Sequence, residues 1–348
     1  MSDELIIKIF LMVFIPFLSV VAIIPIMKKL AFKIGATDKP RNRHIHNKEM
    51  PKLGGLAIFI GFLIGYMIFG EPSPIMNAIL IGSFSIVLTG IIDDIVELGA
   101  ISKIIGQLLA AFVIVFYGQI LLSDVSAFGI YIDFGILAYP ITIIFILACV
   151  NSINLIDGMD GLSGGISSIY FLTIGIIAVL QNKLGLDFVL TFVMLGSTLG
   201  FLVYNFYPAS IFAGDTGSMF MGFIISIIAL LGFKNVTLSS LIVPLLILAI
   251  PFFDTGCAIL RRLIKGESIT HGDKFHIHHQ FLNRKISQRA TVLIIYFINS
   301  LFAIASIVYV LKNRTLGYII YGVLLFLVIL FVAKTNIIFE KRGIFKRK

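Results

Sequence analysis

Five aspartates stand in short polar clusters between apolar runs, and their carboxylates are the groups best able to do chemistry. They are Asp93, Asp94, Asp157, Asp160 and Asp215. Like charges brought close together are costly unless a cation joins them. An all-oxygen ligand set suits a hard ion, Mg²⁺ first and Mn²⁺ second. Because Mg²⁺ binds through one or two carboxylates plus substrate phosphates, these acids indicate phosphate chemistry.

A lysine and an asparagine accompany the acids. Asn154 precedes Asp157 and Asp160 at intervals of three, which places all three on one face if the segment is helical. Gly158 and Gly161 would let a ligand approach the backbone closely. A purely structural role is the alternative for Lys103, which could anchor a helix at the membrane surface. The same holds for Asp93 and Asp94, which could simply end a helix in water.

Three histidines stand within four positions, at His276, His278 and His279 beside Lys274, which favours a ligand site over an interfacial cluster. Zinc bound by these histidines is the alternative to Mg²⁺, but the chain has neither an H-E-x-x-H motif nor a Cys/His quartet. Asp254 lies inside an apolar run, where an ionisable side chain indicates either function or a polar contact between helices.

The hexapeptide Ala-Gly-Asp-Thr-Gly-Ser places Asp215 at the start of an apolar run. The free N–H groups of a helix N-terminus there would favour an anion. Asp-Thr-Gly is also the signature of pepsin-like proteases, which need β-structured lobes that this chain lacks. An intramembrane aspartyl protease would need glycine where the chain has Ala213. No G-x-x-x-x-G-K-[ST] motif is present, which argues against a Walker-type ATPase.

The composition requires a bilayer to position these residues, because 59% of the 348 residues are hydrophobic and 13% are charged. We predict an all-α integral membrane protein, a single domain over 1–348, with about eleven transmembrane helices. The apolar runs cover 5–26, 53–69, 75–91, 103–122, 136–150, 163–180, 187–204, 217–232, 238–260, 290–311 and 315–333.

Lys and Arg are divided unequally between the two sides of this arrangement. The segments after odd-numbered runs, with the C-terminal tail, hold 22 of the 27. The positive-inside rule therefore places the N-terminus outside and the C-terminus in the cytoplasm. The net charge of +9 is explained by this orientation and indicates no nucleic-acid partner.

The unusual polar clusters all follow odd-numbered runs, at 46–55, 93–103, 151–165, 205–218 and 271–281. They are therefore all predicted to be cytoplasmic, which favours one site in a groove on that face. An ion-coupled sugar transporter is an alternative, but transporters place ionisable groups near the midplane, commonly between internal repeats. No repeat is visible here.

The stretches PKLGGLAI, DD, NLIDGMDGL, FAGDTGS and HIHH, in this order, resemble the polyprenyl-phosphate N-acetylhexosamine-1-phosphate transferases. That family includes phospho-MurNAc-pentapeptide translocase and the WecA/TagO-type GlcNAc-1-phosphate transferases. The resemblance implies a multi-pass enzyme of the bacterial plasma membrane, a homodimer, with Mg²⁺ as cofactor. It also implies transfer of HexNAc-1-phosphate from UDP-HexNAc to undecaprenyl phosphate, with release of UMP.

The resemblance also assigns roles to residues. Asp215, with Asp93 as an alternative, is expected to bind the metal. Catalytic roles are implied for Asp93, Asp94, Asp157, His276, His278 and His279. Substrate contacts are implied for Lys52, Lys103, Asn154, Gly158, Met159, Asp160, Asn205 and Phe212. Within these sets, the resemblance places Lys103 at the lipid phosphate, Gly158, Met159 and Phe212 near the uracil, and the histidines at the sugar phosphate.

Two details favour the GlcNAc branch over the phospho-MurNAc-pentapeptide transferases, which remain the alternative. His-Ile-His-His replaces three consecutive histidines, and FFDTGCAILRR is similar to the GlcNAc-type helix. Lys52 departs from the threonine of the peptidoglycan enzyme's motif. For the mechanism we predict direct attack of the lipid phosphate on the β-phosphorus, with a phospho-aspartyl enzyme as the rival.

Overall fold

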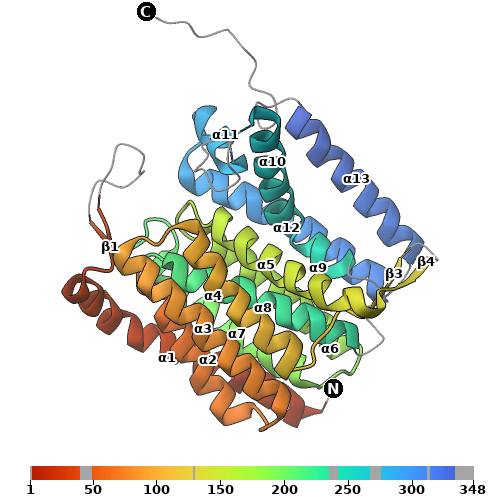
Figure 1. Cartoon of the computed structure of the whole chain (residues 1–348), viewed down its shortest axis with the longest axis horizontal. Coiled ribbons are helices and arrows are strands. Elements are labelled where there is room, and N and C mark those ends of the chain that lie inside the picture. Colours follow the sequence, from red (N-terminus) through yellow and green to blue (C-terminus); the bar gives the residue numbers. More distant parts are fainter. Residues whose placement is uncertain are drawn as a thin grey trace, which may run out of the picture.

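The computed structural model describes residues 2–39, 49–127, 130–234, 242–266, 276–311 and 314–333, which form a bundle of helices with two short hairpins (Figure 1). The first half contains α1 (Asp3–Ile34), α2 (Gly54–Phe69), α3 (Pro74–Val96), α4 (Ala100–Phe112, continued as a π-helix over Val113–Tyr117), α5 (Ala138–Ile156) and α6 (Leu162–Leu180). The second half contains α7 (Leu186–Asn205), α8 (Gly214–Lys234), α9 (Ile242–Ile247), α10 (Ala249–Lys265), α11 (Ile277–Asn283), α12 (Gln288–Leu311) and α13 (Arg314–Ala333). The hairpins are β1 (Thr37–Asp38) with β2 (Met50–Pro51), and β3 (Asp124–Ala127) with β4 (Ile130–Asp133).

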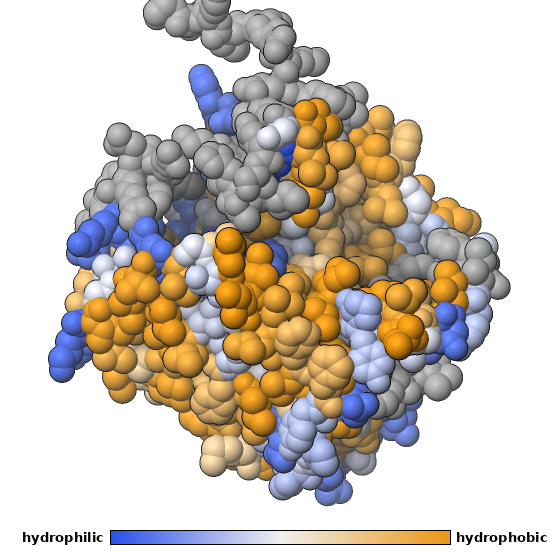
Figure 2. Space-filling model, in the orientation of Figure 1, coloured by the Kyte–Doolittle hydropathy of each residue, from blue (hydrophilic) through white to orange (hydrophobic). Residues whose placement is uncertain are grey.

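The chain is a multi-pass membrane protein, which confirms the predicted all-α membrane class. Among the described residues, eight helical segments are long and apolar enough to cross a bilayer, and α2 and most of α13 are shorter apolar helices. Figure 2 shows the consequence as a broad apolar surface over the helices, with hydrophilic residues gathered mainly at its margins.

Helix α8 lies at the centre of the bundle. It packs against α2, α3, α5, α6 and α7, and 89% of its most apolar stretch is buried. Glycines allow the closest of these contacts. A Cβ on Gly55 of α2 would lie 2.0 Å from the Gly217 nitrogen, and a Cβ on Gly90 of α3 would lie 2.3 Å from Thr216 Cα. Backbone therefore packs against backbone where α8 begins, which fixes Asp215 relative to both helices.

The ninth predicted run, 238–260, is not one continuous helix in the part that the structure describes. It is interrupted at Leu248, between α9 and α10. Pro251 explains the break, because proline has no N–H to offer the carbonyl of residue 247 and its ring crowds that carbonyl. Helix α10 continues to Lys265, beyond the predicted end of the run at 260. Arg261 and Arg262, which lie outside the predicted run, are therefore on this helix and are buried.

Candidate active site

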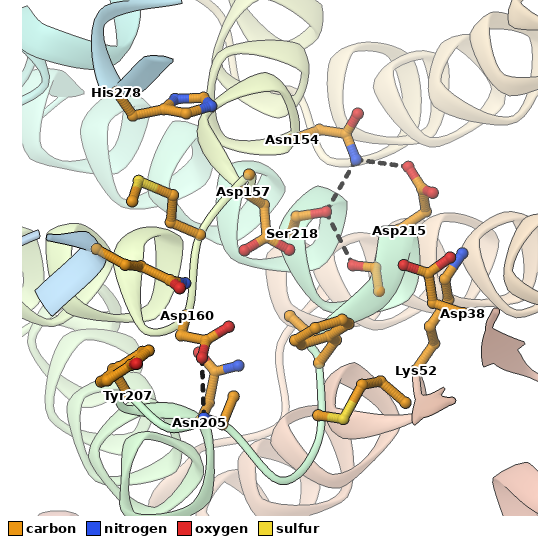
Figure 3. A pocket seen from close by; sticks show the side chains of 18 of the residues that line it. Asp38, Lys52, Asn154, Asp157, Asp160, Asn205, Tyr207, Asp215, Ser218 and His278 are labelled. Atoms are coloured by element: carbon orange, nitrogen blue, oxygen red, sulfur yellow. Dashed lines mark hydrogen bonds between the residues drawn. The ribbon is translucent and has the colours of Figure 1, made fainter. Parts of the chain in front are cut away.

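One cavity of about 690 Å³ opens where several helix ends meet, a volume typical of small-molecule sites (Figure 3). Residues from β1, β2, α3, α5, α7, α8, α11, α12 and connecting segments line it. Among the predicted site residues, those lining it are Lys52, Asp94, Asn154, Asp157, Gly158, Met159, Asp160, Asn205, Phe212, Asp215, His278 and His279. Asp93, Lys103 and His276 lie beside this lining rather than in it.

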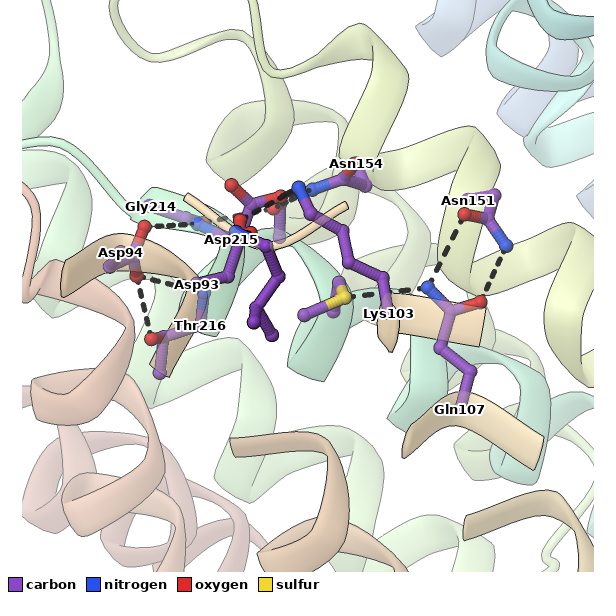
Figure 4. A network of polar contacts seen from close by, with 12 residues as sticks. Asp93, Asp94, Lys103, Gln107, Asn151, Asn154, Gly214, Asp215 and Thr216 are labelled. Carbon is purple, nitrogen blue, oxygen red and sulfur yellow. Dashed lines mark hydrogen bonds and ion pairs between the residues drawn. The ribbon is translucent and has the colours of Figure 1, made fainter. Parts of the chain in front are cut away.

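Asp94, at the end of α3, caps the first turn of α8. Its Oδ1 accepts from the Asp215 N–H at 2.9 Å, and its Oδ2 accepts from the Thr216 N–H at 3.1 Å and the Thr216 hydroxyl at 2.7 Å (Figure 4). A carboxylate here satisfies unpaired N–H groups and is favoured by the helix dipole. We predicted free N–H groups that would hold a ligand anion. That prediction is wrong for these two groups, because the anion that they bind is Asp94.

Lys103 forms an ion pair with two carboxylates. Its Nζ lies 2.7 Å from Asp93 Oδ2 and 3.2 Å from Asp215 Oδ1. The other Asp93 oxygen accepts from the Leu98 N–H at 2.6 Å, so both of its oxygens are engaged, and the side chain is only 4% exposed. The ammonium offsets the repulsion between two acids that the fold brings together. Lys103 therefore ties the start of α4 to the end of α3 and the start of α8.

Asn154, on the last turn of α5, binds the same Asp215 oxygen as Lys103. Its Nδ2 donates to Asp215 Oδ1 at 2.6 Å and lies 2.8 Å from Ser218 Oγ. The Ser218 hydroxyl donates to the Gly214 carbonyl at 2.9 Å. Asp215 is thus oriented by an amide, an ammonium and its own capped helix, while its side chain keeps 23% of its surface exposed. These contacts pre-organise one carboxylate at the cavity wall.

The segment between α5 and α6 places two more carboxylates in the cavity. Asp157 accepts a hydrogen bond from the Ser163 hydroxyl, and Asp160 Oδ2 accepts from the Ala209 N–H at 2.9 Å. Burial raises the pKa of the Asp157 carboxyl to about 7, although the hydrogen bond from Ser163 opposes this shift. Without a bound cation, Asp157 therefore takes up a proton near neutral pH.

Asn205 joins two segments of the cavity wall. Its Oδ1 accepts from the Gly161 N–H at 2.9 Å, and its Nδ2 donates to the Ile211 carbonyl at 2.9 Å. The side chain is 3% exposed. Because both ends of the amide bond to backbone, its contribution in this structure is to hold these segments together. Gly161 has a φ of +80°, a conformation that favours glycine, so local geometry also accounts for this residue.

Lys52 and Phe212 reach the cavity through a short backbone ladder. The Phe212 N–H donates to the Pro51 carbonyl at 2.9 Å, and the Phe212 carbonyl accepts from the Gly54 N–H at 3.0 Å. The Lys52 N–H donates to the Ala36 carbonyl at 3.0 Å. The Pro-Lys-Leu-Gly-Gly stretch therefore positions the segment that leads into Asp215, and it places the Lys52 side chain at the cavity.

The three histidines occupy different places. His276 Nδ1 lies 2.8 Å from Asp254 Oδ2, and Asp254 Oδ1 accepts from the Ile277 N–H at 2.8 Å. Asp254 therefore caps α11 and fixes His276. A polar contact between helices was one of the two roles predicted for Asp254. The His276 ring stacks on His278, with centroids 5.7 Å apart. His278 and His279 line the cavity, whereas His276 lies outside the lining and packs against His278.

Gly158 makes room for one of these rings. A Cβ at this position would lie 2.7 Å from His278 Nε2, so a larger residue would push the imidazole aside. We predicted that Gly158 lets a ligand approach the backbone. In this structure the group that approaches is His278. The α5–α6 segment and α11, far apart in the sequence, are therefore fitted to one another at the cavity.

The pH dependence of stability gives a test of the His278 environment. Burial, together with a smaller effect of the neighbouring His279, lowers the pKa of His278 to about 3. The unfolded chain protonates this histidine below about 6.5, whereas the folded chain does not until much lower pH. Its contribution to stability is therefore complete above 6.5 and is lost as the pH falls toward 3.

We expect His278→Gln to remove about 1 kcal/mol of the stability that the protein loses between pH 7.5 and 5.5. Thermal unfolding in detergent at the two pH values measures this difference. The matched control is His279→Gln, because this neighbouring side chain is only partly buried. Equal pH dependence in wild type and His278→Gln would mean that the histidine titrates normally.

The donor groups of the cavity fit a hard divalent ion. Five aspartates line it, at positions 38, 94, 157, 160 and 215, and Lys52 is the only lysine or arginine among the described residues of the lining. Such a cavity would repel a diphosphate unless a cation entered with it. No group of three or more His, Cys, Asp and Glu placed to hold a metal occurs within the described ranges. This pattern fits Mg²⁺ held by one or two carboxylates and completed by substrate phosphates.

Several lining residues were not among the individual site residues predicted from the sequence. They include Asp38, Met50, Tyr207, Pro208, Ala209, Ser218 and Gln288. Ser218 lies in the hexapeptide around Asp215, one turn after Gly214, and this helical spacing could have identified it. Asp38 and Gln288 carry no such signal, because each stands among ordinary polar residues at the end of an element. Lys274 and residues 46–48 and 271–275 of the predicted clusters lie outside the described residues.

Comparisons with known proteins show the family of the chain. Residues 76–233 match the family described as glycosyl transferase family 4. The whole chain is 43% identical to 96% of a probable undecaprenyl-phosphate N-acetylglucosaminyl 1-phosphate transferase of Bacillus subtilis. Over 78% of the chain, it is 32% identical to 74% of a decaprenyl-phosphate N-acetylglucosaminephosphotransferase of Mycobacterium tuberculosis. Over 77%, it is 29% identical to 75% of an undecaprenyl-phosphate alpha-N-acetylglucosaminyl 1-phosphate transferase of Escherichia coli.

Proposed function

Because the chain belongs to glycosyl transferase family 4, among the polyprenyl-phosphate N-acetylglucosamine-1-phosphate transferases, we propose that it transfers GlcNAc-1-phosphate from UDP-GlcNAc to undecaprenyl phosphate. The products are undecaprenyl-diphospho-GlcNAc and UMP. The names of the relatives do not favour the alternative, transfer of phospho-MurNAc-pentapeptide.

The position of Asp215 between two different environments carries this proposal. On one side lies the polar cavity, with room for a nucleotide sugar. On the other side lies Lys103, whose helix α4 exposes Ile101, Ile104 and Ile105. An ammonium beside an apolar outer surface suits the phosphate of a membrane lipid. The acceptor phosphate and the donor diphosphate would therefore meet at Asp215.

The contacts of the acidic residues favour direct displacement. A non-bridging oxygen of the acceptor phosphate attacks the β-phosphorus, the bond from that phosphorus to the bridging oxygen breaks, and the electron pair leaves with UMP. Asp93 and Asp94 are buried and have both oxygens engaged, which makes either a poor nucleophile. Accumulation of a phosphorylated Asp93 or Asp94 during turnover would refute direct attack and support the rival mechanism.

In this mechanism the protein positions the substrates and neutralises charge. Asp215 is the ligand that we propose for Mg²⁺, with Asp93 beside it. When bound, the ion would offset the negative charge of the diphosphate. Lys52 would contact the donor phosphates, and Lys103 would receive the acceptor phosphate. His278 and His279 lie on the cavity wall, where their imidazoles can hydrogen-bond the sugar phosphate.

We place the cavity on the cytoplasmic side of the bacterial plasma membrane. The distribution of Lys and Arg along the chain supports this orientation. It would also give the enzyme access to a soluble nucleotide sugar and a membrane lipid at one surface. Formation of a homodimer stays a prediction.

A reconstituted assay tests the proposed function. Purified protein is incubated with radiolabelled UDP-GlcNAc, undecaprenyl phosphate and Mg²⁺, and label is measured in the organic phase together with UMP release. We expect lipid-linked label that depends on all three additions, and little label from UDP-MurNAc-pentapeptide. Failure to form a lipid product from any UDP-HexNAc would refute the proposal.

A further inference from the structure

A second polar layer lies one helical turn below the cluster formed by Lys103, Asn154 and Asp215 (Figure 4). Gln107 follows Lys103 by four positions on α4, Asn151 precedes Asn154 by three on α5, and Met219 follows Asp215 by four on α8. These spacings place each second-layer residue on the same helix face as its neighbour in the reactive cluster. The two layers therefore join the same three helices.

The two amides of this second layer bind one another reciprocally. Gln107 Nε2 donates to Asn151 Oδ1 at 3.3 Å, and Asn151 Nδ2 donates to Gln107 Oε1 at 2.7 Å. Asn151 Nδ2 also donates to the Leu147 carbonyl at 2.8 Å, and Gln107 Nε2 lies 3.4 Å from Met219 Sδ. Gln107 is 1% exposed. This pairing links α4 to α5 and brings α4 against α8.

A reciprocal amide pair constrains the position of α4 more than apolar packing would. Both hydrogen bonds break if α4 shifts by one residue along its axis, whereas apolar contacts carry no fixed donor and acceptor positions. Hydrogen bonds between membrane helices contribute little to stability on average, so stability alone gives little reason for two amides here. A fixed axial position matters for Lys103, whose ammonium must reach two carboxylates at once.

We propose that Gln107 and Asn151 are positioning residues, which hold α4 in register with α5 and α8 so that Lys103 reaches Asp93 and Asp215. The inference rests on the proposed transfer reaction, because its readout is the rate of that reaction. The pair touches neither substrate in this proposal and acts only through the placement of Lys103.

The decisive experiment compares Gln107→Leu and Asn151→Leu with the double variant. Each single change leaves the other amide without its reciprocal partner, so we expect a lower Tm and a lower transfer rate. The double variant removes both amides and should recover most of the Tm. If the pair sets the position of Lys103, kcat of the double variant stays at least tenfold below wild type, while the KM for UDP-GlcNAc changes less than twofold. Recovery of kcat together with the Tm would overturn the proposal.

A double-mutant cycle with Lys103 separates positioning from a general effect on packing. When Lys103 is already replaced by Gln, removing the amide pair as well should lower kcat by less than a further factor of two. The reason is that the pair acts through the ammonium, which this variant lacks. Additive losses would contradict this. The exchange variant Gln107→Asn with Asn151→Gln keeps an amide pair and should regain part of the lost rate.

Asn299→Leu is the matched control. Asn299 is a fully buried amide on α12, and neither of its amide atoms has a hydrogen-bond partner among the described residues. Its replacement should leave kcat within twofold of wild type. If wild type itself makes no lipid product, the proposed function fails. If wild type is active and the double leucine variant is equally active, only the positioning inference fails.

Discussion

Asp215→Asn is expected to lower kcat for transfer of GlcNAc-1-phosphate by about 10³-fold, which corresponds to about 4 kcal/mol of transition-state stabilisation. The substitution keeps the shape of the side chain and an oxygen that can accept from Asn154. It removes the charge that pairs with Lys103 and that we propose binds the metal. The loss should therefore arise from charge and not from local unfolding.

Two measurements separate these causes. The Tm of Asp215→Asn in the absence of ligands should stay close to wild type, because the lost attraction to Lys103 is offset by removal of the repulsion with Asp93. The increase in Tm that Mn²⁺ and UDP-GlcNAc produce together in wild type should be lost. Asp133→Asn is the matched control, since Asp133 is exposed on β4 and an asparagine there can still accept from the Gly135 N–H. Activity of Asp215→Asn above one tenth of wild type would exclude it as the main metal ligand.

The sequence predicts the membrane class, most helix positions and the residues that gather around the cavity. These follow from local signals. One is the set of apolar runs of bilayer length, and the other is the confinement of the polar clusters to the segments that follow odd-numbered runs. Asp93, Asp94 and Asn154 nevertheless lie on the last turns of helices and not in loops. Hydropathy places a helix end too early when polar residues occupy its last turn, because it measures solvation and not backbone conformation.

Pairing over long sequence separations could not be predicted. Asp94 and Thr216 are 122 positions apart, and nothing in either local sequence indicates that one caps the other's helix. Asn205 shows the same limit, because the sequence does not reveal that both ends of its amide bond to backbone, and its contact with substrate stays a prediction. A polar residue near a site can contact substrate or hold the wall in place, and only its partners decide between these roles.

The amide pair of Gln107 and Asn151 shows a second reason why the sequence alone does not reveal such contacts. Gln107 lies within an apolar run, and a single glutamine does not change the hydropathy of such a run. Its meaning depends on Asn151, which stands on a different helix. Buried polar residues in membrane helices are costly when unpaired, so each one in this sequence predicts a partner without identifying it. The structure supplies that partner.

Gly214→Ala is expected to have the second largest effect, because it disturbs the capped start of α8. Gly214 has a φ of +68°, which alanine adopts at a cost of about 1–2 kcal/mol. An added Cβ would also lie 2.4 Å from Asp94 Oδ2 and 2.4 Å from the Lys52 carbonyl oxygen. Neither group can move easily, since Asp94 is held by three hydrogen bonds and the Lys52 backbone belongs to the ladder beside Phe212.

We expect Gly214→Ala to lower the Tm and to reduce kcat at least 100-fold in the protein that remains folded, since displacing Asp94 reorients the backbone that carries Asp215. Activity is measured on the monodisperse fraction at a temperature well below the Tm, so that unfolding does not account for the loss. Gly322→Ala on α13 is the control, because a Cβ there would meet no atom within 4 Å. If the two alanine variants behave alike, the contact between Asp94 and the start of α8 is not what positions Asp215, and the acid at position 94 must act on substrate directly.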